Sequence, residues 1–455
     1  MFNRKIIKYL IKWKNRTDRK PLIIRGARQV GKTVSVKMFA EKHFKESILI
    51  NLDNPEHEML FRQPVSLDDF EKIVQLKFGK KIVEGETLLF IDEIQNSPGL
   101  INLLRFFYEQ RPLLHVIAAG SLLEVKMKRE GFNFPVGRVE FAYLYPLDFF
   151  EFLEANGQLE LLGFLENCSF KKEIPPAIAA MAKKSFDEYL MVGGMPEAVK
   201  VFVTQKDLSA LGRVYNSLLT SYSEDIFKYA SEAKAKYIRH CLENAPFFVG
   251  QAITYAHFAE SNFRSHEIAE AFEILEKAML LYRVMGTSHF NLPLIPKKKK
   301  APKLLFLDVG LVNYKLGLRE KMFDFESLNP IFKGQIAEQV VGQHLIQLEE
   351  TSPPLIYYWY RNSPGSTAEV DFIFYCKDKV VPLEVKFGQS GSLRSSKELV
   401  KASKIKSIIR LYNGSMLVEA AQIEDVKFSL FSLPFYLLPN LNKIIGEDLA
   451  SPTSS

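Results

Sequence analysis

Short apolar runs alternate with amphipathic stretches in the first third of the chain. Residues 21–25 form an apolar run, a glycine-bearing loop follows it, and apolar residues then recur at helical spacing from Lys32 to about His43. Further apolar runs, several of them separated by helical patterns, follow at 47–52, 87–91, 114–119 and 139–145. Strands that alternate with helices predict an α/β fold over residues 1–145, in which helices cover both faces of a mainly parallel sheet.

The pattern changes twice in the middle of the chain. Over 146–235 the apolar spacing is helical and is interrupted by paired glycines in YLMVGGMPEA, so we expect an all-helical lid. Residues 252–286 then predict a helix, a turn, a second helix and a strand, which indicates a winged-helix-like domain over 236–315. The second helix, SHEIAEAFEILEKAML, contains four glutamates and one lysine, which favours packing between domains over contact with DNA.

The last third combines strands with two helices. The expected order is a helix at about 333–350, strands at 355–360, 369–375 and 380–387, a basic helix near 393–405 and a strand at 408–413. This α-β-β-β-α-β order predicts a second α/β domain over 316–445. Residues 446–455 have few apolar side chains, and we expect a disordered tail there.

Composition limits the class of protein. The chain has 455 residues, of which 47% are hydrophobic and 25% are charged, and this balance is typical of folded globular domains. No stretch approaches about 20 uninterrupted apolar residues, so we expect neither a membrane span nor a signal peptide. Cys168, Cys241 and Cys376 lie far apart and fit neither a metal pattern nor a disulfide framework. A cytoplasmic location is therefore expected.

The positive charge is unevenly distributed. The net charge is +7, and basic residues are concentrated in residues 1–20, in the run Lys297 to Lys300 and over 371–410. Such clusters are weak indications of nucleic acid, because a solvated helix face or loop often has the same composition. DNA is therefore a candidate partner.

A phosphate-binding motif follows the first apolar run. The motif GxxxxGK[ST] is matched by Gly26, Ala27, Arg28, Gln29, Val30, Gly31, Lys32 and Thr33. Backbone N–H groups of such a loop surround phosphates, Lys32 neutralises the β- and γ-phosphates, and the Thr33 hydroxyl binds Mg²⁺. The sequence therefore predicts ATP and Mg²⁺ as cofactors.

A second motif supports hydrolysis. Asp92 and Glu93 end the apolar run LLFI, where an open α/β sheet presents its ligands. Asp92 is expected in the Mg²⁺ shell and Glu93 beside the attacking water, which suits a hydrolase better than a small-molecule kinase. Ser121 ends another apolar run. The motifs resemble the additional-strand glutamate class of P-loop ATPases, and that resemblance implies a polar sensor of the γ-phosphate at Ser121, although an ordinary turn residue explains the serine equally well.

These motifs carry a resemblance to a known family. The segments PLIIRGARQVGKT, LLFIDEIQ, AAGSLLEV, VGRVEFAYLYPLDFFEF, YLMVGGMPEAV, FLDVGLVNY and GQIAEQVVGQHL resemble a large prokaryotic family of AAA-like P-loop ATPases with a C-terminal domain of unknown function. The extra strand at 47–52 and the adjacent Glu93 are similar to the additional-strand glutamate class. The resemblance implies an arginine that reaches the γ-phosphate of a neighbouring subunit in a homo-oligomer. Arg138 is the closest match, although a structural salt bridge explains it equally well.

The C-terminal strands carry a second set of candidate residues. Asp371, Glu384 and Lys386 fit D-x(n)-E-x-K, and Glu338 on the preceding helix could complete a metal shell. Carboxylates that hold Mg²⁺ and a lysine that orients water are the groups that phosphodiester hydrolysis requires. The spacing alone is weak, but the α-β-β-β-α-β order resembles that of PD-(D/E)xK nucleases. A basic helix follows, with Arg394, Lys397, Lys401, Lys404 and Lys406.

Two functions remain open on this reading. The first is an Mg²⁺-dependent ATPase coupled to a nuclease-like domain directed at nucleic acid. The alternative is a regulatory ATPase whose nuclease-like domain is an inactive binding or docking module.

Overall fold

The N-terminal region folds around a five-stranded parallel sheet. The computed structural model describes residues 2–121, 135, 137–318, 330–376, 379–388 and 394–448. The strand order is β2-β3-β4-β1-β5, and every neighbouring pair is parallel. The strands are β1 (Leu22–Arg25), β2 (Glu46–Asn51), β3 (Thr87–Asp92), β4 (His115–Gly120) and β5 (Glu140–Tyr143). The α/β fold predicted from the alternation is confirmed.

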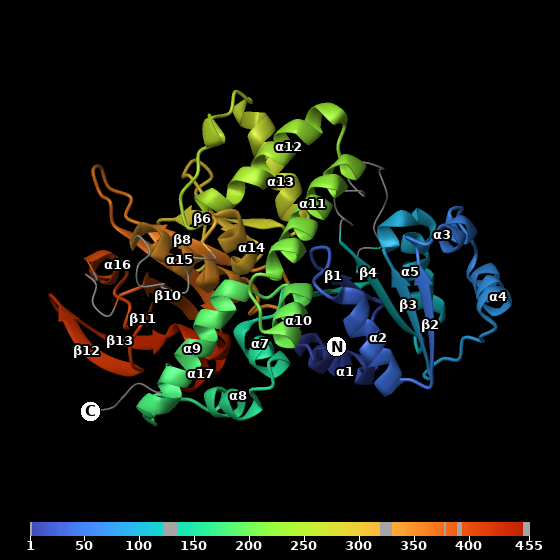
Figure 1. The fold of residues 1–455 in the computed structure, drawn as a ribbon, viewed down its shortest axis with the longest axis horizontal. Helices are drawn as coiled ribbons and strands as arrows, with labels where there is room; N and C mark the ends of the chain where they lie inside the picture. Colours follow the sequence, from blue (N-terminus) through green and yellow to red (C-terminus); the bar gives the residue numbers. More distant parts are fainter. Residues whose placement is uncertain are drawn as a thin grey trace.

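Helices cover both faces of this sheet (Figure 1). They are α1 (Lys5–Asn15), α2 (Lys32–His43), α3 (Pro55–Phe61), α4 (Leu67–Phe78), the short turn η1 (Ile94–Asn96) and α5 (Pro98–Gln110). Successive residues of β3 point to opposite faces, because Leu88 and Phe90 enter one core while Leu89 and Ile91 enter another. Burial on both faces explains why the strands read as uninterrupted apolar runs.

Residues 149–229 form a helical region, as the spacing predicted. Its helices are α7 (Phe149–Ala155), α8 (Leu159–Glu166), α9 (Pro176–Val192), α10 (Pro196–Gln205) and α11 (Leu211–Tyr229). The paired glycines end α9, and Gly193 adopts a φ of 64°, which favours glycine. Gly194 N–H donates to Asp308 Oδ2 at 2.6 Å, and Gly194 O accepts from Leu147 N–H at 2.7 Å. This turn therefore connects three segments that are far apart in sequence.

A mixed sheet of eight strands forms the C-terminal region. Its order is β12-β13-β11-β10-β9-β8-β6-β7. The expected order is seen in α15 (Pro330–Ile346), β8 (Ile356–Tyr360), β9 (Glu369–Cys376), β10 (Lys379–Lys386), α16 (Arg394–Ser403) and β11 (Ser407–Tyr412). The chain continues through β12 (Leu417–Ile423), β13 (Val426–Pro434), η5 (Phe435–Asn440) and α17 (Leu441–Asp448). These last elements were not predicted.

The segment expected as a separate winged-helix-like domain shares the C-terminal sheet. It contains α12 (Glu232–Asn244), η2 (Ala245–Phe248), η3 (Phe258–Glu260), α13 (Ser265–Lys277), β6 (Leu281–Thr287), β7 (Lys303–Phe306) and α14 (Val309–Lys315). Strand β6 pairs antiparallel with β7 and parallel with β8. The expected boundary between 315 and 316 is therefore corrected, because the hydrogen bonds of one sheet span both sides of it. The tail expected at 446–455 begins inside α17, and residues 449–455 lie outside the described residues.

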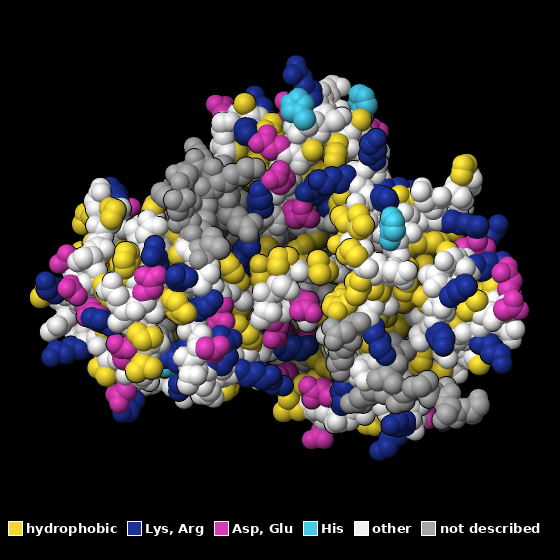
Figure 2. Space-filling view, turned by 180° about the vertical axis from the view of Figure 1, so that it is seen from behind, with side chains coloured by type: hydrophobic (Ala, Val, Ile, Leu, Met, Phe, Trp, Pro, Cys, Tyr) yellow, Lys and Arg dark blue, Asp and Glu magenta, His cyan; other side chains and the backbone are white. Residues whose placement is uncertain are grey.

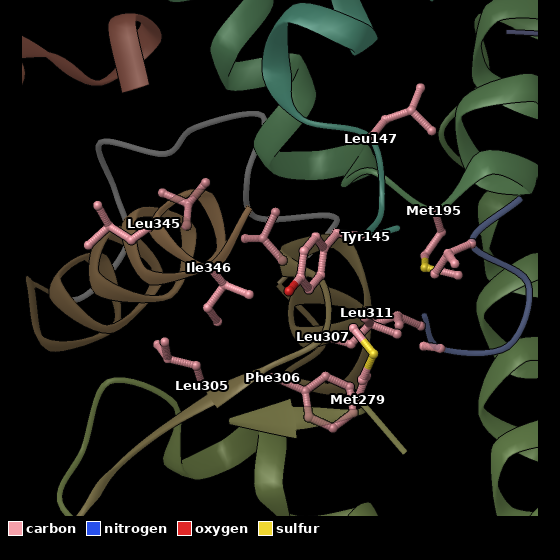
Figure 3. Packing of buried hydrophobic residues seen from close by; sticks show 14 of the residues in the cluster. Tyr145, Leu147, Met195, Met279, Leu305, Phe306, Leu307, Leu311, Leu345 and Ile346 are labelled. Atoms are coloured by element: carbon pink, nitrogen blue, oxygen red, sulfur yellow. The ribbon is translucent and has the colours of Figure 1, made fainter. Parts of the chain in front are cut away.

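One apolar core joins all of these regions. Figure 3 shows side chains from the segment after β5, from the helical region, from β7 and from α15 packing together. Tyr145, Met195, Phe306 and Ile346 are among them. A core of this extent transmits displacement between the two sheets better than a hydrated hinge would. Among the described residues, none of the helices is long and apolar enough to cross a membrane.

Candidate nucleotide site and carboxylate cluster

The loop from Gly26 to Thr33 lies between β1 and α2, as a phosphate-binding loop must. Gly31 precedes α2 with a φ of 99°, and Gln29 also has a positive φ of 65°. A Cβ added at Gly26 would lie 2.3 Å from Leu144 O. Glycine is therefore required at 31 by backbone conformation and at 26 by close packing.

Lys32 points back into this loop. Its side chain is buried, and Nζ donates to Gly26 O and Ala27 O at 2.9 Å each. Burial lowers the pKa of Lys32, and the charges of Glu93 and Asp92 oppose that shift. An ammonium that is desolvated and held by carbonyl oxygens alone has strong capacity for an anionic ligand.

The two predicted Mg²⁺ ligands are in contact. Thr33 Oγ1 donates to Asp92 Oδ2 at 2.6 Å, which joins the first turn of α2 to the end of β3. Burial raises the pKa of Asp92. A Mg²⁺ ion that is shared with nucleotide phosphates needs only one or two protein ligands, and this pair fits that requirement.

Glu93 has an unusual backbone conformation beside Asp92. Its φ is 53°, in the left-handed region that costs a non-glycine residue on the order of 1 kcal/mol. Burial raises the pKa of Glu93, and its carboxylate accepts a hydrogen bond from Gln95 Nε2. Gln95 belongs to η1, and its buried side chain lies against Gly120 at the end of β4. A Cβ on Gly120 would lie 2.4 Å from Gln95 Oε1. Sequence reasoning missed Gln95, although it lies in the same FIDEIQ segment.

These residues fit ATP with Mg²⁺. The loop presents backbone donors at a helix N-terminus, Lys32 adds a buried ammonium, and Thr33 and Asp92 would hold the ion. Bound Mg²⁺ would neutralise phosphate charge during phosphoryl transfer.

Arg28 links the loop to the helical region. It forms an ion pair with Asp225 of α11, and its other terminal nitrogen lies 3.8 Å from Asp53 Oδ2. Ser121 is buried at the end of β4 and lines a cavity of about 30 Å³ with Arg28, Tyr222 and Asp225. Ser121 is therefore close to the loop, as a sensor requires. Nothing in the spacing of Asp225 pointed to this contact.

The same small cavity is lined by α13 and the residues after it. Ile274, Leu275 and Ala278 face Arg28 and Ser121 across it. Helix α13 therefore lies beside the nucleotide loop and also contacts β6 of the C-terminal sheet. The preference for packing over DNA contact stays a prediction.

Arg138 forms a contact within its own chain. Its Nε lies 3.0 Å from Glu109 Oε1, and its guanidinium lies 6.0 Å from the centre of the Tyr108 ring. The arginine is 44% exposed. The structural salt bridge that explained this residue is thus present, and a role at a neighbouring subunit's nucleotide needs a second chain.

Asp371, Glu384 and Lys386 converge in the C-terminal sheet. The antiparallel register pairs Phe372 with Leu383, which places Asp371 beside Glu384. Asp371 Oδ2 accepts from the Val385 N–H at 2.8 Å, and Lys386 Nζ lies 2.6 Å from Glu384 Oε1. Burial and the nearby charge of Asp371 raise the pKa of Glu384 to about 7.

Lys303 lies in the same cluster and was not predicted. Its Nζ is 2.8 Å from Glu369 Oε1, 2.9 Å from Glu338 Oε2 and 3.5 Å from Asp371 Oδ1. Burial alone would lower the pKa of Lys303, but these carboxylates raise it. Burial and the charge of Asp371 raise the pKa of Glu338 to about 8. A lone lysine that opens the apolar strand KLLF was a usable signal, but the adjacent run of lysines obscured it.

The predicted metal shell of Glu338, Asp371 and Glu384 is corrected by this arrangement. In the part of the chain that the structure describes, no three Asp, Glu, His or Cys side chains are placed so that they could hold a metal ion. The carboxylates do converge, but Lys303 and Lys386 occupy the space between them. As folded, the cluster does not fit a divalent metal.

Several basic side chains of residues 1–20 form ion pairs and hydrogen bonds within the chain. Arg4 is buried and bonds to Glu151 at 3.0 Å and to Val30 O at 2.9 Å, and Arg16 bonds to Glu140 at 2.8 Å. On the face shown in Figure 2, basic and acidic side chains are intermixed. Exposed basic side chains are found on and just after α16, namely Arg394, Lys397, Lys401, Lys404 and Lys406.

Comparison with protein families divides the chain into three parts. Residues 18–153 match a family described as an AAA domain. Residues 183–322 match a domain of unknown function, DUF8612, and residues 333–435 match another, DUF4143. A search of curated proteins found no match.

Solved structures give distant similarities. The Walker-type ATPase PABY2304 of Pyrococcus abyssi is 13% identical, with a TM-score of 0.44 over 70% of this chain and 96% of that chain. The RuvB Holliday junction branch migration motor of Thermotoga maritima is 16% identical, with a TM-score of 0.28 over 66% of this chain and 93% of that chain. PCH-2 of C. elegans is 12% identical, with a TM-score of 0.26 over 45% of this chain and 63% of that chain.

The class of the N-terminal region follows from its match and its geometry. A parallel five-stranded sheet, a phosphate-binding loop after β1 and an acidic pair at the end of β3 occur together within the matched residues. This region is an AAA-like ATPase domain of the P-loop type.

Proposed function

We propose that the protein binds ATP with Mg²⁺, hydrolyses it, and uses its nucleotide state to control a nuclease-like C-terminal region directed at nucleic acid. The observation that carries the proposal is the Thr33 to Asp92 hydrogen bond of 2.6 Å. It joins the phosphate-binding loop to the acidic end of β3, which is where a P-loop ATPase needs its ion.

Each residue at the nucleotide site has one role in this proposal. The loop N–H groups and Lys32 bind the phosphates, Thr33 and Asp92 hold the ion, and Glu93 orients the attacking water. Gln95 positions Glu93 through its side-chain amide. Ser121 contacts the terminal phosphate.

The Arg28 to Asp225 ion pair provides a route from the nucleotide to the rest of the chain. Phosphate oxygens attract Arg28 and compete with the carboxylate on α11. Movement of α11 is then transmitted through the shared core to α14, because the ring of Tyr215 on α11 packs against that of Tyr314 on α14, with 5.4 Å between the centroids and 34° between the planes.

The C-terminal region is proposed to bind nucleic acid rather than to cleave it. Its element order and the convergence of Asp371, Glu384 and Lys386 support a nuclease-like fold. The exposed lysines of α16 provide phosphate contacts. Lys303, buried among the carboxylates, favours the binding module over the active nuclease.

Labelled DNA and RNA, incubated with the protein with and without ATP and Mg²⁺ or Mn²⁺, test this proposal. We expect salt-sensitive binding that changes with ATP, and no cleavage. Replacing both Lys397 and Lys401 should weaken binding, because both are exposed on α16. Lys45→Ala is the control, because Lys45 is an exposed lysine of the ATPase domain that pairs with Glu86. Metal-dependent cleavage that Asp371→Ala eliminates would instead establish the nuclease.

Arg138 gives a separate prediction about subunits. Because Arg138 pairs with Glu109 at the surface, Arg138→Ala should change the free energy of unfolding by less than about 1 kcal/mol. ATP affinity of the dilute protein should be unchanged. A fall in hydrolysis that appears only as protein concentration rises, and that Glu109→Gln does not reproduce, would support a role in a homo-oligomer. If Arg138→Ala and the wild type hydrolysed ATP at equal rates at every protein concentration, that role would be excluded.

A further inference from the structure

We propose that Lys303 is the built-in cation of the carboxylate cluster, so that the folded cluster excludes divalent metal and becomes a metal site when the ammonium is removed. The inference rests on the proposed nuclease-like organisation of this region. It concerns which cation the cluster holds, not ATP hydrolysis.

The geometry of Lys303 is that of a buried ion and not of a surface lysine. Its side chain is only 6% exposed, and Nζ lies within 3.5 Å of one oxygen from each of three carboxylates. Lys386, in contrast, is 28% exposed and forms an ion pair with Glu384. The three carboxylates are 15% to 34% exposed, and converging carboxylates that are partly removed from water repel one another, so a cation at this position stabilises them.

The backbone fixes Lys303 in place. In strand β7, Lys303 pairs with Val284 of β6 and bridges to Ala252 on its other side. The flanking residues are also held, because Leu304 N–H donates to Gln251 O at 3.0 Å. The side chain passes 5.7 Å from the centre of the Tyr358 ring. The ammonium therefore reaches the cluster from a rigid strand.

The charge balance predicts what removal of Lys303 does. Four carboxylates, from Glu338, Glu369, Asp371 and Glu384, share the cluster with two lysines. Loss of one lysine leaves a larger excess of negative charge in a cluster whose carboxylates are 3% to 34% exposed. Carboxylate oxygens are the ligands that Mg²⁺ and Mn²⁺ prefer, so a divalent cation is the natural replacement.

Mn²⁺ binding to the full-length protein, measured by the electron paramagnetic resonance signal of free Mn²⁺ in the absence of nucleotide, tests this inference. All proteins carry Lys32→Ala, which separates the measurement from the nucleotide site. The otherwise unchanged protein should bind no Mn²⁺ that depends on Asp371. Lys303→Met should bind one Mn²⁺, at least about tenfold more tightly than any residual Mn²⁺ held by the protein that retains Lys303, and Asp371→Asn should remove this new site. Lys300→Met, on the exposed run nearby, is the matched control.

Two results would overturn the inference. One is Mn²⁺ binding by protein that retains Lys303, if Asp371→Asn removes it; this comparison decides the matter even if Lys303→Met does not fold. The other is a folded Lys303→Met protein, with a wild-type circular dichroism spectrum, that gains no Mn²⁺. Neither result would affect the measurements of nucleic-acid binding and ATP hydrolysis that test the proposed function. Failure of this inference can therefore be distinguished from failure of the proposed function.

Discussion

Lys32→Ala is expected to weaken ATP binding by on the order of 100-fold or more. The mutation removes a buried ammonium whose present partners, the carbonyl oxygens of Gly26 and Ala27, are neutral. Charged hydrogen bonds of this kind contribute about 1.5–3 kcal/mol each, and phosphate offers more than one acceptor. Equilibrium titration with a fluorescent ATP analogue measures the loss.

Lys37→Ala is the matched control for this prediction. Lys37 lies on the same helix, α2, but its side chain is exposed. We expect its replacement to leave ATP affinity within about twofold of wild type. Equal affinities of Lys32→Ala and Lys37→Ala would place the phosphates elsewhere.

Gly194→Ala is expected to destabilise the whole molecule by about 3 kcal/mol or more. An added Cβ would lie 2.0 Å from Leu147 O and 2.8 Å from Leu147 N, both of which are backbone atoms that cannot rotate away. The same residue donates its N–H to buried Asp308. The mutation therefore disturbs the turn that joins the helical region to the segment after β5 and to Asp308, and urea denaturation should show a lower midpoint.

Gly163→Ala provides the control. Gly163 lies inside α8, and a Cβ there meets no atom within 4 Å. Alanine in a helix interior is favoured over glycine by about 0.5–1 kcal/mol, so this protein should be slightly more stable than wild type. If Gly194→Ala were as stable as the wild type, Gly194 could not lie as close to the backbone of Leu147 as the structure places it.

The local parts of the fold were predictable from sequence. Strands β1 and β3 are buried on both faces, and this explains the apolar runs before Gly26 and Asp92. The α-β-β-β-α-β order was also predictable, because each strand pattern is bounded by polar or glycine-rich segments. Asp371 and Glu384 could be placed together because antiparallel neighbours share a register.

Long-range pairing accounts for what sequence reasoning missed. The parallel pairing of β6 with β8 joins residues more than 70 positions apart, and no local pattern encodes it. Lys303 enters the carboxylate cluster only because that pairing carries β7 to the sheet edge. Asp225 meets Arg28 for a similar reason, since α11 returns across the loop only in the folded chain.

Single-turnover hydrolysis of ATP by Glu93→Gln tests the central claim most directly. The glutamine retains the shape of Glu93 but loses the carboxylate that polarises water, while the loop and the Thr33 to Asp92 pair stay intact. We expect the Glu93→Gln protein to keep ATP bound and to cleave it on the order of 100- to 1000-fold more slowly than the wild type does. Cleavage at the wild-type rate would contradict the central claim.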